Sequence, residues 1–313
     1  MEYFSILVPG DYSAPRPEFT EELFRRFISY IDVKPSSVAT YTRAIRQFFR
    51  WLHFNNIYSP QRNDILAFRD DLRNKGLKPT TIQSYIIAVR QFFKWTAQEG
   101  LYKNIADNIK GAQLTAEHKK DALTSAQAKR ILQSMDTATI IGKRDFAIMA
   151  LMLTGGLRTI EVARANVEDL RPLGDEIVLY IQGKGQDERT DYVKVVPEVE
   201  QAIRAYLSER GSVTDSAPLF ASHSDRNLGQ RMTAVSISRI VKTAFRKAGF
   251  DSHRLTAHSL RHTAGTLNLL SGGTLEETQQ LLRHSKISTT MIYLHHLDRA
   301  KNNSERRIAN VLF

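Results

Sequence analysis

Apolar residues recur at helical spacing over the first third of the chain. The stretch TEELFRRFISYI opens the pattern as an amphipathic segment, and the spacing predicts helices from about Glu18 to Ile109. Two segments within it, KPSSVATYTRAIRQFFRW from Lys34 and KPTTIQSYIIAVRQFFKW from Lys78, are identical at nine of eighteen positions. Two copies are too few for a solenoid, so we expect a small bundle of paired helical hairpins.

Each copy of this repeat combines a helix start with an aromatic stripe and basic positions. Ser or Thr follows Pro in both copies, which predicts a side-chain cap at the start of each helix. The paired aromatics fall at packing positions and predict the core of the bundle: Phe48, Phe49, Phe92 and Phe93. The interleaved basic residues fit a solvated face, and beside a nucleic-acid site they are candidate phosphate contacts: Arg43, Arg46, Arg50, Arg90 and Lys94.

The hydrophobic pattern changes beyond a polar stretch, Gly111 to Asp121, which is typical of a linker. A capped helix is expected near Thr124, and RDFAIMALMLTGG predicts a buried helix that ends at a glycine pair. EIVLYIQGKGQDERTDYVKVVP predicts two β-strands around a glycine-bearing turn at Lys184. The helical pattern returns from Val199 to the end, so we expect a mainly α-helical protein with a small β-sheet.

Composition adds a class of partner to this picture. The 313 residues carry a net charge of +11, and basic side chains outnumber acidic ones in both halves of the chain. Such a charge balance favours a polyanionic partner such as nucleic acid. The absence of cysteine excludes a disulfide framework, a thiol nucleophile and any zinc site that needs Cys. No apolar run is long enough to span a membrane and the start does not resemble a signal peptide, so we expect a soluble intracellular protein.

Four separated segments carry unusual polar groups. They are TGGLRTIEVARANVEDL with Arg158, QGKGQDER with Lys184, HSLRHTAGT with His258 and Arg261, and LLRHSKISTTMIYLHH with His284 and Tyr293. A phosphodiester attacked by an oxygen nucleophile gains negative charge on its equatorial oxygens, which arginines and imidazoles can stabilise.

Several of these residues can take a chemical role in such a reaction. Arg158 and Arg261 can each bind phosphate oxygens in a bidentate fork, and His258 shares a helical face with Arg261. Tyr293 is the candidate nucleophile, and Lys184 on its turn can protonate the leaving alkoxide. The chemistry needs no metal and no other cofactor, because cationic side chains supply the electrostatic stabilisation.

At these residues the sequence resembles the tyrosine recombinase family, the phage integrase and Xer type of site-specific DNA recombinase. The family's G-L-R-x-x-E segment is matched by Gly156 to Glu161, and its G-K-G turn by Gly183 to Gly185. Its H-x-L-R-H box is matched by His258 to His262, and its L-x-H-x(8)-Y box by Leu282 to Tyr293. The order and spacing of all four motifs agree.

The resemblance implies a domain plan. It comprises an N-terminal extension (1–17), a helical core-binding domain with a SAM-like bundle (18–110), a linker (111–122), an α+β tyrosine recombinase catalytic domain (123–297) and a C-terminal tail (298–313). The two domains are expected to close around double-stranded DNA.

The resemblance also implies a reaction that integrates, excises or resolves DNA. Tyr293 would attack the scissile phosphate to give a 3′-phosphotyrosine and a free 5′-hydroxyl, and a hydroxyl from a partner duplex would reverse the step. The implied roles are phosphate binding by Arg158 and Arg261, protonation of the leaving group by Lys184, acid and base catalysis by His258, and transition-state assistance by His284. Glu161 is expected to orient an arginine rather than touch DNA.

The implied partners follow from the family's assembly. We expect a homo-tetramer on two DNA sites, a monomer or weak oligomer without DNA, an accessory DNA-bending or directionality protein, and a cytoplasmic, nucleoid-associated location. The apolar end IANVLF predicts a tail that docks on a neighbouring subunit through Ile308, Val311, Leu312 and Phe313, with packing in cis as the alternative.

Two departures from the family pattern affect single residues. Asp187 stands where a second lysine is common, so Lys184 is the main candidate, with Lys194 and Arg189 as helpers. RHS replaces the commoner GHS, which makes Arg283 a candidate for an additional phosphate contact.

Two other functions share part of this pattern. A type IB topoisomerase uses the same chemistry but would relax supercoils as a monomer without a preferred site. A DNA-binding regulator could keep the fold without activity, although the full set of polar residues argues against such a loss.

Overall fold

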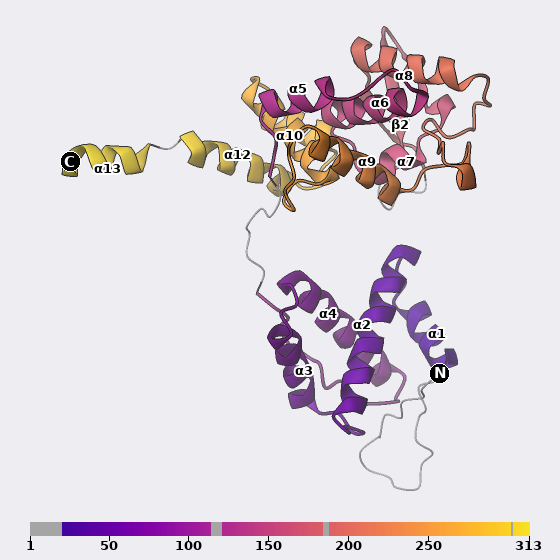
Figure 1. Cartoon of the computed structure of the whole chain (residues 1–313). Helices are drawn as coiled ribbons and strands as arrows, with labels where there is room; N and C mark the ends of the chain where they lie inside the picture. Colours follow the sequence, from indigo (N-terminus) through magenta and orange to yellow (C-terminus); the bar gives the residue numbers. More distant parts are fainter. Residues whose placement is uncertain (1–20, 114–120, 184–187, 302) are drawn as a thin grey trace. The chain divides into compact units, whose positions relative to one another are not determined.

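The computed structural model describes residues 21–113, 121–183, 188–301 and 303–313, and the chain divides into two compact units, residues 1–117 and 118–313 (Figure 1). The predicted N-terminal extension and most of the predicted linker lie outside the described residues. Helices dominate both units, and a small antiparallel sheet belongs to the second. The mainly α-helical fold class with a small sheet is therefore confirmed.

The described part of the first unit is a bundle of α-helices. They are α1 (Glu21–Tyr30), α2 (Pro35–Phe54), α3 (Arg62–Asn74) and α4 (Pro79–Gln98). The two copies of the repeat form α2 and α4, which pack against each other. The predicted aromatic core is confirmed, because Phe48, Phe49, Phe92 and Phe93 are at most 3% exposed and their rings contact one another edge to face.

The predicted side-chain caps of α2 and α4 are wrong. The N-cap residues are Lys34 and Lys78, neither of which makes a side-chain cap hydrogen bond, and the helices begin at Pro35 and Pro79. Proline suits this first position because its φ angle is already helical and its missing N–H would have no partner there. The Ser and Thr residues consequently fall inside the first turn.

The five basic side chains of the repeat are exposed, as a solvated face or a phosphate-binding face requires. Arg43, Arg46 and Arg50 follow one another at three- and four-residue steps on α2, and Arg90 and Lys94 do so on α4. Residues at these steps share a helix face. Their role as DNA contacts stays a prediction.

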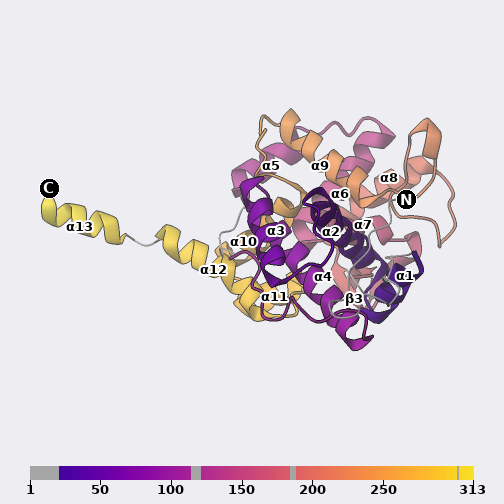
Figure 2. The same ribbon diagram turned by 90° about the horizontal axis from the view of Figure 1, so that it is seen from below.

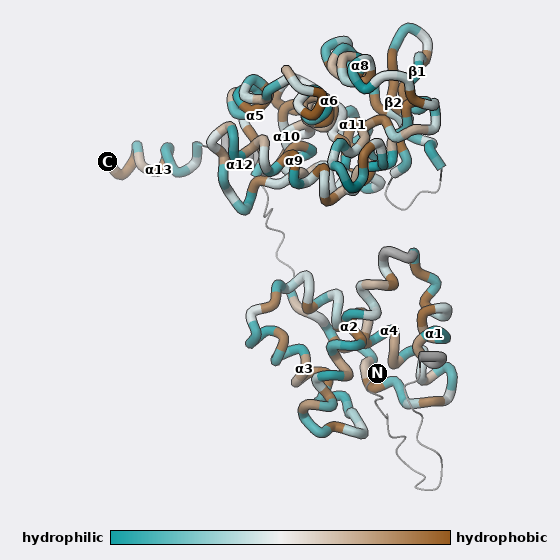
Figure 3. The backbone as a smooth tube through the Cα atoms, turned by 45° about the vertical axis from the view of Figure 1, so that its right-hand side comes forward, coloured by the Kyte–Doolittle hydropathy of each residue, from teal (hydrophilic) through white to brown (hydrophobic). Residues whose placement is uncertain are grey.

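The second unit surrounds a buried helix. Its helices are α5 (Ser125–Gln133), α6 (Ile140–Gly155), α7 (Thr159–Arg164), α8 (Pro197–Arg210), α9 (Ala234–Lys247), α10 (Ala257–Leu270), α11 (Leu275–Leu282), α12 (Ile287–Lys301) and α13 (Ser304–Leu312). α6 packs against α8 and α10, and its run of hydrophobic positions is brown in Figure 3. Two predicted boundaries are confirmed: Thr124 caps α5 by accepting from Gln127 N, and Gly156 ends α6 in a left-handed conformation.

The sheet has one strand more than the sequence pattern predicts. β2 (Glu176–Ile181) and β3 (Asp191–Lys194) are the predicted pair, and β1 (Leu170–Leu173) adds to the other side of β2 in antiparallel order. β1 is short, contains a proline and is largely exposed, so it lacks the alternation that identifies a half-buried strand. Gly174, at φ 60°, permits the tight turn between β1 and β2.

The C-terminal helix α13 exposes its apolar side chains. Ile308 is 60% exposed, Val311 85%, Leu312 69% and Phe313 fully exposed. In Figures 1 and 2 the helix extends away from the other helices of its unit. The described residues contain no helix that is both long enough and apolar enough to cross a bilayer.

Candidate active site

Arg158 is positioned by the junction between two helices. α6 ends at Gly155, and Gly156, with φ 57°, turns the chain toward α7. Arg158 is the N-cap residue of α7, and its backbone N–H donates to Oε2 of Glu161 at 2.8 Å. The G-L-R-x-x-E spacing therefore provides a turn, a helix start and the carboxylate that satisfies that helix start.

Glu161 joins two arginines in the interior. Its side chain is fully buried, and Oε1 accepts from Arg158 Nη1 at 2.7 Å while Oε2 accepts from Arg283 Nη2 at 2.9 Å. Burial alone would raise the pKa of this carboxyl, but the charges of Arg283 and Arg158 and the bonds from Arg158 outweigh it and hold the pKa below the ordinary value. Glu161 is therefore a charged anchor that orients guanidinium groups.

Arg261 reaches the same region from α10. The side chain is 1% exposed, Nη1 donates to the Gly156 carbonyl at 2.6 Å, and Nη2 donates to the Leu282 carbonyl. Burial, followed by the charges of Arg158 and Arg283, lowers the pKa of Arg261 to about 9, which leaves it charged at neutral pH. A guanidinium carries five N–H donors, so two carbonyl bonds hold it without using all of them.

Tyr293 lies on α12 and packs against α10. The residue is 5% exposed and forms a small cluster with Ala264 and Leu282, and its ring passes close to Gly265. Burial raises the pKa of the Tyr293 phenol to about 12, although the nearby charges of Arg261 and Arg158 act in the opposite direction. The phenol is thus protonated at neutral pH and sits in the field of both arginines.

Imidazole rings flank Tyr293. The His262 ring centroid is 5.2 Å from that of Tyr293 and 4.5 Å from that of His258. The His284 ring is 6.3 Å away and nearly parallel to the phenol, and its Nδ1 is 2.9 Å from Oγ1 of Thr290. Burial, followed by the charges of Arg261 and Arg158, lowers the pKa of His284 to about 4, so this ring is neutral at pH 7.

The structure therefore brings together residues from three of the four predicted motifs: Arg158, His258, Arg261, His284 and Tyr293. Lys184 lies outside the described residues, as does Asp187. The residue before that turn is fixed, because the Gly183 carbonyl accepts from Nη1 of Arg164 at the end of α7. Arg189 pairs with Asp169 and Lys194 pairs with Glu176.

Arg283 is far less exposed than Arg158, another predicted phosphate contact, whose side chain is 30% exposed. Its side chain is 9% exposed, and its Nη groups donate to Glu161 and to backbone carbonyls. A direct bond to a phosphate would require it to leave these partners. The predicted phosphate contact of Arg283 stays untested, but the geometry favours an internal role.

A groove opens beside Arg158 and His258. It has a volume of about 660 Å³, and its lining includes Lys242 and His253 together with the first residues of α10. Four basic side chains thus line one hollow, and the N-terminus of α10 adds a partial positive charge. Such a surface suits an anionic ligand.

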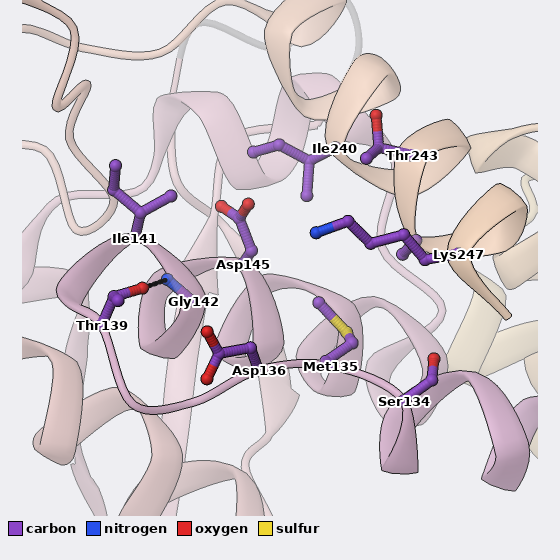
Figure 4. Close-up of a pocket in the computed structure, with 11 residues that line it drawn as sticks. Ser134, Met135, Asp136, Thr139, Ile141, Gly142, Asp145, Ile240, Thr243 and Lys247 are labelled. Carbon is purple, nitrogen blue, oxygen red and sulfur yellow. Dashed lines mark hydrogen bonds between the residues drawn. The ribbon is translucent and has the colours of Figure 1, made fainter.

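A second pocket of the same unit has a different character. It lies between the start of α6 and α9, has a volume of about 140 Å³, and none of the predicted site residues line it. Figure 4 shows Asp145 and Lys247 reaching into it, with Thr139 Oγ1 bound to the N–H of Gly142 at the helix start. Among the residues that the structure describes, no three His, Asp or Glu side chains gather as a metal site.

Sequence reasoning missed the residues that hold the site in shape. Thr290 is completely buried and binds His284, and the buried Leu282 contributes its carbonyl to Arg261. Gly265 allows the ring of Tyr293 to approach α10. These residue types occur throughout the chain, and only the spacing of Leu282 in its motif drew attention to any of them.

The protein has a helical unit followed by a second helical unit that contains a three-stranded sheet. In the second unit a buried tyrosine lies among arginines and imidazoles, which defines the class of site. The chain belongs to the phage integrase family: the family profile matches residues 121–300, and that of the phage integrase N-terminal SAM-like domain matches residues 22–100. The prediction of the family from its motifs is confirmed.

Similar proteins carry recombinase names. A tyrosine recombinase XerC of Caldanaerobacter subterraneus is 34% identical over 62% of this chain and 52% of its own length. The tyrosine recombinase slr0733 of Synechocystis is 27% identical over 97% of both chains. The aligned part of this chain thus spans about half the length of the first of these relatives.

Solved structures share the fold at low identity. A XerH site-specific recombinase bound to palindromic difH substrate has a TM-score of 0.72 at 20% identity, covering 93% of this chain and 85% of its own. A lambda integrase dimer bound to a COC′ core site has a TM-score of 0.67 at 16% identity, covering 86% and 94%.

Proposed function

We propose that this protein is a site-specific DNA recombinase that cuts and rejoins duplex DNA through a 3′-phosphotyrosine. The observation that carries the proposal is the position of Tyr293, a buried phenol within the field of Arg261 and Arg158 and flanked by His284. Membership of the phage integrase family and the recombinase names of the relatives support it.

The reaction assigns one task to each side chain. The Tyr293 oxygen forms a bond to phosphorus as the bond to the 5′-oxygen breaks, and His258 accepts the phenolic proton. Arg158 and Arg261 bind the phosphate oxygens on which charge accumulates, and the neutral His284 donates a hydrogen bond there. Lys184 gives a proton to the leaving 5′-oxygen, and a 5′-hydroxyl from a second duplex reverses the step.

The electrostatics of the site fit this mechanism. A protonated phenol must lose its proton during attack, and two guanidiniums next to it stabilise both the phenolate oxygen and the phosphate. The basic groove beside Arg158 and His258 supports double-stranded DNA as the ligand. A type IB topoisomerase shares this chemistry, but the recombinase names of the relatives favour strand exchange.

The assembly on DNA is part of the proposal. We propose a tetramer on two DNA sites, joined by α13, whose exposed apolar side chains are suited to dock on a neighbouring subunit. The same proposal includes an accessory DNA-bending or directionality protein and a cytoplasmic location with nucleoid association. It also includes the domain plan 1–17, 18–110, 111–122, 123–297 and 298–313. The exposed basic side chains of α2 and α4 would contact the DNA backbone: Arg43, Arg46, Arg50, Arg90 and Lys94.

Covalent capture tests the function. Nicked duplexes with a randomised core would be incubated with the protein in EDTA, and adducts would be separated on a denaturing gel and sequenced. We expect an adduct on a preferred sequence that is lost in Tyr293→Phe and retained in the control Tyr192→Phe, which alters an exposed tyrosine of β3. An adduct that persists in Tyr293→Phe would refute the mechanism, and adducts without any sequence preference would favour a topoisomerase.

A further inference from the structure

Arg283 occupies a backbone position that favours glycine. It is the C-cap residue of α11, with φ 51° and ψ 49°, in the left-handed region where a Cβ atom is crowded. The backbone of Arg283 therefore adopts a conformation that is unfavourable for a residue with a side chain. Contacts of its side chain must compensate for this.

Those contacts are all directed into the protein. Nη1 donates to the Leu281 carbonyl at 2.6 Å and to the Gly155 carbonyl at 3.2 Å. Nη2 donates to Glu161 Oε2 at 2.9 Å and to the Gly156 carbonyl at 3.2 Å. The guanidinium thus joins the end of α11 to the turn that precedes α7.

Two of these acceptors are shared with the proposed phosphate-binding arginines. Glu161 also accepts from the side chain and the backbone N–H of Arg158. The Gly156 carbonyl also accepts from Nη1 of Arg261. The Arg283 guanidinium therefore contacts both acceptors: the Glu161 carboxylate that holds Arg158 and a carbonyl that holds Arg261.

We propose that Arg283 is a positioning residue that keeps Arg158 available for phosphate by occupying the second carboxylate oxygen of Glu161. This inference rests on the proposed function. With Arg283 present, the Arg158 side chain binds Glu161 through Oε1. Without it, Glu161 faces one cation instead of two, and a carboxylate with a single guanidinium partner prefers a bidentate pair. Such a pair would hold Arg158 away from the DNA.

The charges support the same conclusion. Arg283 contributes the largest cationic effect that holds the pKa of Glu161 below its ordinary value. It also repels Arg158 and Arg261, since its charge acts on both groups. Removal of Arg283 would strengthen the attraction between Glu161 and Arg158 and weaken the repulsion that directs Arg158 outward.

A direct phosphate contact by Arg283 predicts a different result, and salt dependence separates the two. Loss of one phosphate contact lowers the slope of log affinity against log salt by about 0.9. A residue that acts through Glu161 lowers the slope only because Arg158 is drawn to the carboxylate, so Glu161→Gln should restore the slope. A lost direct contact of Arg283 would not be restored by that change.

The test compares Arg283→Gly, Glu161→Gln and the double variant with the wild-type chain. Glycine suits the left-handed backbone, so we expect Arg283→Gly to remain folded, as melting curves would verify. In Arg283→Gly the rate of adduct formation on the selected nicked duplex should fall at least about tenfold, and the salt slope should fall because Arg158 is held off the phosphate. Adding Glu161→Gln should recover part of the rate and of the slope, because it removes the carboxylate that competes for Arg158.

Two further variants control for charge and for general destabilisation. Arg283→Lys retains a cation that can contact Glu161 and should keep more activity than Arg283→Gly. Arg144→Ala removes another arginine that is 8% exposed, pairs with Asp145 and donates to the Ala221 carbonyl, but has no contact with Glu161. It should lower the melting temperature without a comparable loss of cleavage rate in the folded protein.

The outcomes separate this inference from the proposed function. A wild-type chain that forms no Tyr293 adduct would overturn the proposed function and the inference with it. An active wild type with an equally active Arg283→Gly variant would overturn the inference alone. A salt slope that stays reduced in the double variant would also overturn it, in favour of a direct phosphate contact. A double variant slower than both single ones would overturn it in favour of a purely structural role.

Discussion

Gly265→Ala tests how the packing of α10 against α11 holds the candidate site in shape. A Cβ atom at this position would lie 2.8 Å from Cδ1 of Leu282 and 3.5 Å from Cζ of Tyr293. The second distance is an ordinary contact, whereas the first is about 1 Å shorter than the optimum for two carbon atoms. Leu282 would therefore have to move, and Tyr293 would not be displaced directly.

Leu282 has little room for this movement. It is completely buried. Its other methyl, Cδ2, lies only 2.8 Å from the position that a Cβ atom on Gly156 would take, so it cannot move toward Gly156 if that space is needed. The side chain thus fills the gap between two glycines. Forcing an extra methyl into such packing typically costs about 1–3 kcal/mol, while Ala in place of Gly within a helix gains about 0.5–1 kcal/mol. The expected net effect is a loss of about 0–2.5 kcal/mol in the free energy of unfolding.

Activity should respond more strongly than stability. The Leu282 carbonyl accepts a hydrogen bond from Arg261, so a shift of Leu282 displaces the guanidinium as well. A displaced catalytic group commonly lowers a rate by about 100-fold. We expect a small drop in melting temperature but a large loss of adduct formation at temperatures where the variant is folded.

The assay pairs thermal melting with single-turnover adduct formation, and Thr266→Ala serves as the neighbouring control on α10. The control improves helix propensity without adding volume, so it should keep both properties near the wild-type values. A Gly265→Ala variant that melts higher than wild type and cleaves at the wild-type rate would refute the reasoning. It would mean that α10 and α11 can separate without disturbing the site.

Two further predictions concern acid stability and assembly. The pKa of His284 is about 4 in the folded chain because of burial and nearby cations, against an ordinary value of 6.5. As the pH falls, the unfolded chain therefore binds a proton at His284 before the folded chain does, so the free energy of unfolding should fall between about pH 6.5 and pH 4. The fall should be smaller in His284→Gln. Urea unfolding at a series of pH values would measure it, and equal profiles for the two proteins would contradict the prediction. Deletion of residues 308–313 should leave the melting temperature unchanged, because their apolar side chains are exposed, but abolish cooperative assembly on DNA in gel-shift titrations. Unchanged assembly would exclude docking in trans.

The sequence predicted the elements whose residues carry a local signal. The buried helix α6 is predicted by its hydrophobic run, and its end by the glycine pair. The start of α5 is predicted by the capping side chain of Thr124. β1 was missed because a four-residue edge strand with a proline has no alternation to detect. The caps of α2 and α4 were misassigned by two residues, since Pro and Ser or Thr are adjacent and both favour a helix start.

The candidate site was predictable in its polar groups but not in its supports. The order and spacing of the motifs identified Arg158, Arg261 and Tyr293, because each residue alone is common but their combination is rare. The carbonyls of Gly156 and Leu282 that hold Arg261 are invisible there, because every residue has a carbonyl and only the fold decides which ones converge.

These supports explain why glycine, leucine and arginine occur together around the tyrosine. The Gly156 carbonyl holds Arg261 and Arg283, and the absence of a side chain on Gly156 and Gly265 lets Leu282 enter between the helices. Leu282 in turn directs its own carbonyl at Arg261. The packing of α10 against α11 and the orientation of the guanidiniums are therefore one structural arrangement. A change in either should alter both, so variants that loosen this packing should lose cleavage before they lose the fold.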